Sequence, residues 1–135
     1  MSPTQGYAEF YRRSIEDRDA FWTEQAALVD WKRPFDRVCN HDNPPFARWF
    51  EGGLTNLCHN AVDRHLKDRP DHNALIFVST ETDVERSYSF RELHAEVQRM
   101  AAVLLSLGVK KGERVLIYMP MIPEAGFKVV VLESA

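Results

Sequence analysis

The sequence has few cysteines, no long hydrophobic run and no large excess of charge of either sign. None of its apolar runs approaches the roughly 20 residues of a membrane-spanning helix, and its start lacks the basic and then apolar layout of a secretory signal. Its 17 Lys and Arg against 20 Asp and Glu, a formal net charge of −3, give no electrostatic reason to expect nucleic-acid or anionic-membrane binding. We therefore expect a cytoplasmic protein with no nucleic-acid or membrane partner. In that compartment the two cysteines, Cys39 and Cys58, are expected to be reduced thiols.

The common motifs of nucleotide-binding and hydrolytic enzymes are also absent. The sequence contains neither G-x-G-x-x-G nor G-x-x-x-x-G-K-[ST], and it contains neither G-x-S-x-G nor H-E-x-x-H. Paired glycines can let backbone amides approach an anion, but Gly52 and Gly53 stand between aromatic residues, a pattern more typical of a tight bend. The basic pairs at 12–13 and 110–111 are interpreted as solvated charges on a helix face and a turn.

Histidine and cysteine raise two further possibilities. The run Asp63, Arg64, His65 looks like a catalytic cluster, but consecutive helical residues point in different directions. A zinc site would normally show close ligand pairs such as C-x₂-C, and this spacing is missing among Cys39, His41, Cys58, His59 and His65. We therefore expect no catalytic, cofactor-binding or metal-binding residue in this chain.

The first 56 residues combine helices with an aromatic, irregular stretch. Apolar side chains recur at helical spacing on both sides of an acidic break at residues 16–17; they include Tyr7, Phe10, Tyr11, Phe21, Trp22, Ala26 and Val29. Residues 30–56 hold too many prolines and glycines for a long helix, yet they carry five large rings: Trp31, Phe35, Phe46, Trp49 and Phe50. We expect an extended arm whose rings pack into another part of the protein, because each ring can bury on the order of 150–250 Å².

The rest of the chain has clearer patterns. Residues 56–66 are expected to form one amphipathic helix capped by Thr55 or Asn56, with an apolar side that consists of Leu57, Ala61, Val62 and Leu66. Residues 74–80 and 86–90 are expected to be strands joined by a polar hairpin. A long helix follows, with Ser89 and Glu92 in a capping box and Gly108 just after its end.

The last 22 residues suggest a further strand and helix. The nearly continuous apolar run at residues 114–119 favours a strand covered on both faces, as in a parallel sheet. Strand, helix, strand and helix in this order begin an α/β crossover fold, and 44% apolar residues suffice for a core. The expected fold class is α/β, with an α+β N-terminal arm.

The stretch from residue 44 to residue 66 resembles the N-terminal segment of the short-chain acyl-CoA synthetases. It follows the signature W-F-x-G-G-x-x-N-x-C-x-N-x-V-D-R-H at Trp49, Phe50, Gly52, Gly53, Asn56, Cys58, Asn60, Val62, Asp63, Arg64 and His65. The resemblance extends over residues 7–125 and looks closer to the members that act on propionate than to those that act on acetate. It implies an N-terminal segment at 1–69 and the start of an AMP-binding domain at 70–135.

This resemblance implies an enzyme that joins a small carboxylic acid to coenzyme A through an acyl-adenylate, with ATP and Mg²⁺. The family's phosphate loop, its CoA-binding arginines and its catalytic lysine lie downstream of the residues seen here. We therefore expect an N-terminal fragment that is inactive alone and whose partner is the rest of the synthetase. The matched residues are expected to be structural.

The tail departs from the family pattern after Ala125. Three consecutive valines at 129–131 favour a strand over a helix, because β-branched side chains lose rotamer freedom in helices. The mismatch favours a shifted reading frame or an engineered end over real divergence. Two other classes of protein stay open: a self-standing interaction module that uses exposed aromatic residues, and a Cys/His zinc protein.

Overall fold

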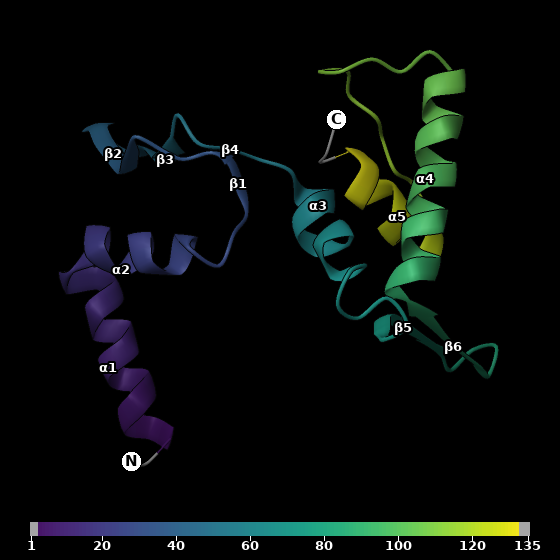
Figure 1. Cartoon of the computed structure of the whole chain (residues 1–135), viewed down its shortest axis with the longest axis horizontal. Coiled ribbons are helices and arrows are strands. Elements are labelled where there is room, and N and C mark those ends of the chain that lie inside the picture. Colours follow the sequence, from purple (N-terminus) through teal and green to yellow (C-terminus); the bar gives the residue numbers. More distant parts are fainter. Residues whose placement is uncertain (1–2, 133–135) are drawn as a thin grey trace. The chain divides into compact units, whose positions relative to one another are not determined.

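The structure of the chain, a computed structural model, describes residues 3–132. The chain divides into two compact units, Met1–Thr55 and Asn56–Ala135, which we call the N-terminal and C-terminal units (Figure 1). No helix within the described residues is long and apolar enough to cross a membrane. Helices and strands occur in both units, so the expected mixed class of fold is confirmed.

The N-terminal unit begins with two helices, as predicted. Helix α1 spans Pro3–Glu16 and helix α2 spans Arg18–Ala26, with the expected break at Asp17. Phe21 of α2 is only 1% exposed, and its ring meets the Phe10 ring edge-on at a centroid distance of 4.7 Å. An ion pair between Arg13 and Glu24, 2.7 Å long, also joins the two helices. The helical hairpin is thus held by an aromatic contact and an exposed charge pair.

The predicted extended arm is organised into strands. Strand β2 (Arg37–Asn43) pairs antiparallel with β3 (Phe46–Glu51) across a turn that contains a cis peptide bond at Pro44-Pro45. The short strands β1 (Trp31–Arg33) and β4 (Leu54–Thr55) are also paired antiparallel. The prolines and glycines that exclude a helix therefore lie in turns between short strands.

The aromatic residues of this arm contact one another and α2, but none of the five is buried, so the expectation that they pack into another part of the protein stays a prediction. The rings of Trp31, Phe35 and Phe50 form a triad with centroid distances of 5.1–5.6 Å. The Trp49 ring meets that of Trp22 on α2 at 5.7 Å. Such pairs contribute about 0.5–1.5 kcal/mol each beyond area burial. Phe46 and Trp49 are the most exposed of the five, at 71% and 45%.

The C-terminal unit opens with two short helical turns in place of the single helix predicted for residues 56–66. Helix α3 (Leu57–Ala61) is capped by Asn56, whose side chain accepts a hydrogen bond from the His59 amide at 2.7 Å. The chain leaves helical geometry at Val62 and continues as the 3₁₀ turn η1 (Asp63–His65). Val62 is 1% exposed, so the break places this side chain in the core, while Leu57 on the predicted apolar side remains exposed.

The hairpin and the long helix that follow confirm the prediction. Strands β5 (Asn73–Ser79) and β6 (Val84–Ser89) pair antiparallel, and helix α4 spans Phe90–Ser106. Ser89 and Glu92 form the complete capping box, and Gly108 has a φ of +84°. A left-handed residue just beyond a helix favours glycine, because it lacks a Cβ atom.

The predicted strand at 114–119 and its parallel sheet are not formed within residues 3–132, where the sheets are three antiparallel pairs. A strand needs a partner for its backbone groups, and no other segment in the described chain pairs with this one. Residues 114–119 are instead an extended connection to helix α5 (Pro123–Leu132), which confirms the helix expected after the two prolines.

Helix α5 closes the core of the C-terminal unit. The buried residues of this core come from the position before η1 and from β6, α4 and α5. They are Val62, Tyr88, Leu93, Val97 and Phe127. Val130 and Val131 pack against them, so the prediction of a strand for the three valines is wrong. Each β-branched residue costs a helix roughly a few tenths of a kcal/mol. The burial of apolar side chains in the core outweighs this cost.

Candidate functional site

A groove with a volume of about 490 Å³ runs along helix α4 in the described C-terminal unit. Its walls are mainly apolar, and the aliphatic part comes from α4, the loop after it and α5: Val97, Ala101, Leu104, Leu105, Val109 and Val131. Lys110 and Lys111 also line it, so this basic pair borders a groove and is not only a solvated turn. Apolar walls with a few polar groups are typical of surfaces that receive a ligand or another part of a protein.

One end of the groove is polar and centres on Asp63. Its carboxylate accepts a hydrogen bond from the Cys58 thiol at 3.7 Å, and the Nε2 atom of His94 lies 3.7 Å from the same oxygen. His94 also contacts Gln98, one turn later on α4, at 3.2 Å. These distances are long for strong hydrogen bonds. The arrangement orients Asp63 toward the groove without forming a tight catalytic cluster.

The run Asp63, Arg64, His65 diverges in space, as expected from its sequence. Asp63 faces Cys58 and His94, whereas Arg64 donates to the side chain of Asn60 at 3.0 Å. The His65 ring lies against the Phe90 ring, with a centroid distance of 4.7 Å. The three side chains therefore have separate packing partners.

Gly52 and Gly53 form a tight bend after β3. The Gly53 amide donates to the Phe50 carbonyl at 3.0 Å, and Gly52 has a φ of +81°. A Cβ atom on Gly52 would collide with the carboxylate of Asp36, and one on Gly53 would lie 2.6 Å from the Trp31 ring. A carboxylate beside the bend repels anions, so the geometry favours the structural interpretation of the glycine pair over a phosphate cradle.

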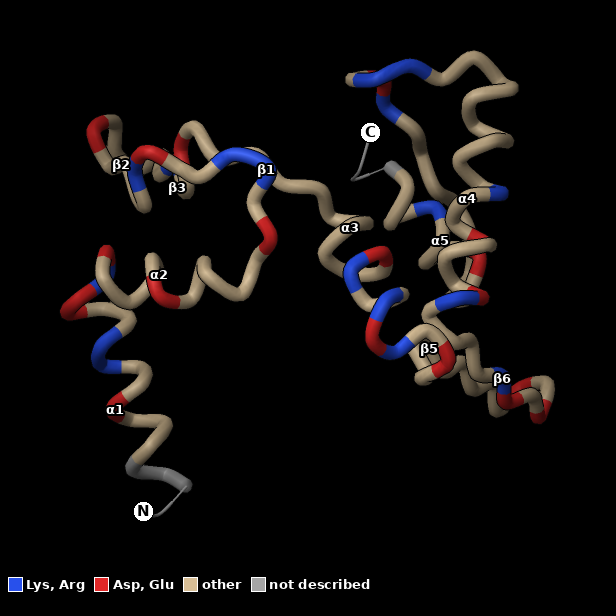
Figure 2. The backbone as a smooth tube through the Cα atoms, in the orientation of Figure 1, with Lys and Arg blue, Asp and Glu red and all other residues tan. Residues whose placement is uncertain are grey.

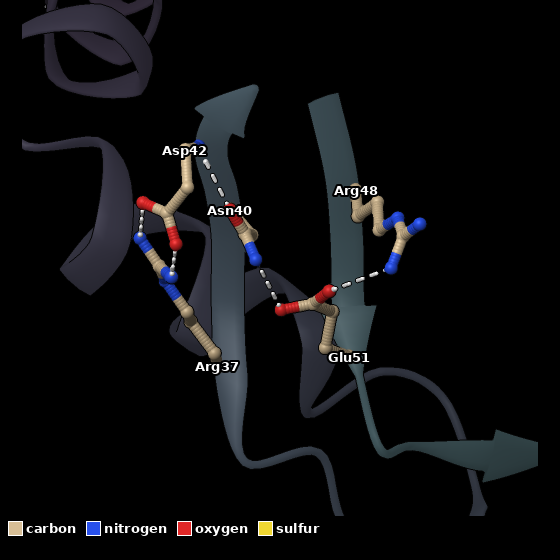
Figure 3. Close-up of polar contacts among 5 residues, drawn as sticks. All are labelled: Arg37, Asn40, Asp42, Arg48 and Glu51. Atoms are coloured by element: carbon tan, nitrogen blue, oxygen red, sulfur yellow. Dashed lines mark hydrogen bonds and ion pairs between the residues drawn. The ribbon is translucent and has the colours of Figure 1, made fainter. Parts of the chain in front are cut away.

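A polar network ties β2 to β3 in the N-terminal unit (Figure 3). Arg37 donates to both carboxylate oxygens of Asp42 at 2.6 and 2.9 Å, and this contact lowers the pKa of Asp42 and raises that of Arg37. The Asn40 amide donates to Glu51 across the strands at 2.8 Å, and Arg48 lies 3.8 Å from Glu51. Both carboxylates thus have cationic or amide partners within the hairpin. Sequence reasoning missed this network because it depends on strand register.

The remaining candidates have structural partners. Arg12 pairs with Glu9 at 2.7 Å and with Glu16 at 2.8 Å on the surface of α1, which raises its pKa through hydrogen bonds to the two carboxylates. Cys39 and Cys58 are both thiols in the structure, as predicted. In the portion of the chain that the structure describes, no group of three or more His, Cys, Asp and Glu side chains could hold a metal ion.

His94 and Gln98 were not singled out from the sequence, although they line the groove. They lie four residues apart on α4, beside the apolar stripe that contains Val97. Polar residues at this spacing on the edge of an apolar helix face are a signal that could have identified them.

Two family models together match residues 7–127. Residues 7–61 match the acetyl-coenzyme A synthetase N-terminus, and residues 62–127 match the AMP-binding enzyme family. The chain therefore belongs to the acyl-CoA synthetases of the AMP-binding enzyme family. The resemblance seen in the signature around Trp49 is thus confirmed.

Curated relatives agree with this assignment. The chain is 60% identical over 119 residues to a propionate–CoA ligase of Salmonella typhimurium. The aligned stretch covers 88% of the chain and 19% of the relative. It is 48% identical over 124 residues to an acetyl-coenzyme A synthetase of Methylobacterium radiotolerans, covering 90% of the chain and 19% of that relative. The chain thus spans about a fifth of the length of the curated relatives it matches.

A solved structure supports the fold. The acetoacetyl-CoA synthetase from Streptomyces lividans matches with a TM-score of 0.82 and 35% identity, covering 95% of this chain and 20% of that one. The mixed helix-and-strand architecture is therefore that of the corresponding part of an acyl-CoA synthetase.

Proposed function

We propose that this chain supplies the N-terminal part of an ATP-dependent, AMP-forming acyl-CoA synthetase that acts on propionate. The observation that carries the proposal is the 60% identity to a propionate–CoA ligase, which extends across both compact units. The two consecutive family matches support it, because the order of segments is that of such an enzyme.

The proposed reaction has two steps. A propionate oxygen attacks the α-phosphorus of ATP, which releases pyrophosphate and gives propionyl-adenylate. The thiolate of coenzyme A then attacks the propionyl carbonyl carbon, and AMP leaves. ATP, Mg²⁺ and coenzyme A belong to the whole synthetase, and the small carboxylate is its substrate.

We assign this chain a scaffolding part in the reaction. In the described chain the carboxylates of the β2–β3 network are paired, and the glycine bend faces Asp36. These residues do not fit a nucleotide phosphate or a divalent cation, so no chemical step is derived from them. We therefore propose that catalysis requires residues beyond this chain, and that the chain alone is inactive.

Two finer features belong to the same proposal. We place the end of the N-terminal segment near residue 69 and the start of the AMP-binding segment near residue 70. A cytoplasmic location fits a synthetase that uses ATP and coenzyme A, and the described helices offer no membrane span.

A chimera tests the proposed function. Residues 7–125 would replace the aligned part of the Salmonella typhimurium propionate–CoA ligase, with which the chain shares 60% identity. We expect the chimera to form propionyl-CoA at a rate within about tenfold of the parent, because the transplanted residues support the site without contacting substrate. A folded chimera without propionate-dependent activity would contradict the proposal.

The alternative that the whole enzyme acts on acetate is favoured by one observation, the 48% identity to an acetyl-coenzyme A synthetase. A second chimera in the Methylobacterium radiotolerans enzyme distinguishes the two. We expect the same residues to retain a larger share of parental activity in the propionate–CoA ligase, where more of the surrounding contacts match. A larger share in the acetyl-coenzyme A synthetase would favour acetate.

A further inference from the structure

We draw no further inference here: the strongest candidate, the apolar groove along helix α4 with basic residues from the loop after α4 and Asp63 from η1 in its walls (Figure 2), carries none because nothing in the structure shows what covers it.

Discussion

The ring of Phe127 meets the ring of Tyr88 edge-on, with centroids 5.4 Å apart and planes 78° from parallel. Phe127 lies on α5, at the end of the stretch that matches the AMP-binding enzyme family, and Tyr88 lies on β6. Both residues are buried, at 4% and 3% exposure. Helix α5 therefore contributes to the core of the C-terminal unit.

The first prediction concerns this contact. Phe127→Ala should destabilise the C-terminal unit by about 3 kcal/mol, because it removes a buried ring and leaves a cavity. Val129→Ala on the same helix is the control, since Val129 is half-exposed and alanine favours helices. Urea denaturation followed by far-ultraviolet circular dichroism measures both. Equal effects of the two substitutions would show that α5 does not pack through Phe127.

The second prediction concerns the capping box of α4. The Ser89 side chain accepts from the Glu92 amide at 3.2 Å, and Glu92 accepts from the Ser89 amide at 2.8 Å. Ser89→Ala should therefore lower the free energy of unfolding by about 1 kcal/mol. Ser89→Asp, which preserves an accepting oxygen, should retain most of the stability in the same denaturation experiment.

The capping box also predicts a pH dependence. The hydrogen bond from the Ser89 amide lowers the pKa of Glu92 below its usual value of 4.5. A lowered pKa in the folded state means that this stabilisation is complete above pH 4.5 and is lost as the pH falls through the folded pKa. The decrease in the thermal midpoint from pH 6 to pH 3 should thus be smaller in Glu92→Gln than in the unaltered chain. A larger fall in Glu92→Gln would contradict the assignment.

The third prediction concerns the bend after β3. Gly53→Ala should destabilise the N-terminal unit by about 1–3 kcal/mol, because the new methyl group would lie 2.6 Å from the Trp31 ring. That ring cannot easily move, since its Nε1 atom donates to the Ala26 carbonyl at 2.9 Å. Tryptophan fluorescence during denaturation reports on this unit, where all three tryptophans lie.

A second glycine in the same unit is the matched control. Gly6 lies in α1, and a Cβ atom there meets nothing within 4 Å. Gly6→Ala should leave stability unchanged or raise it by up to about 1 kcal/mol, because alanine favours helices. If Gly53→Ala were as mild as Gly6→Ala, the close packing of the bend would be wrong.

Features set by nearby residues were predictable from the sequence. The capping box at Ser89, the glycine after α4 and the two strands of the β5–β6 hairpin depend on neighbours within a few residues. The break at Val62 was not predictable, because it is favoured by burial against residues distant in the sequence. The valines of α5 show the same effect, since core packing outweighs local propensity.

Features that depend on pairing were less predictable. The strand predicted for the apolar run at residues 114–119 is not formed, because a pattern of side chains does not supply the neighbouring strand. The contact between Asn40 and Glu51 was missed for a related reason, because it depends on how β2 and β3 pair. The signature around Trp49 predicts the family, and the expectation that its residues are structural stays a prediction.

Propionate-dependent exchange of labelled pyrophosphate into ATP tests the central claim most directly. We expect background exchange for the purified chain and clear exchange for the full-length chimera that carries its residues 7–125, because we propose that the adenylate-forming groups lie outside the chain. Propionate-dependent exchange by the purified chain alone would contradict the claim that it supplies a scaffold rather than the catalytic site.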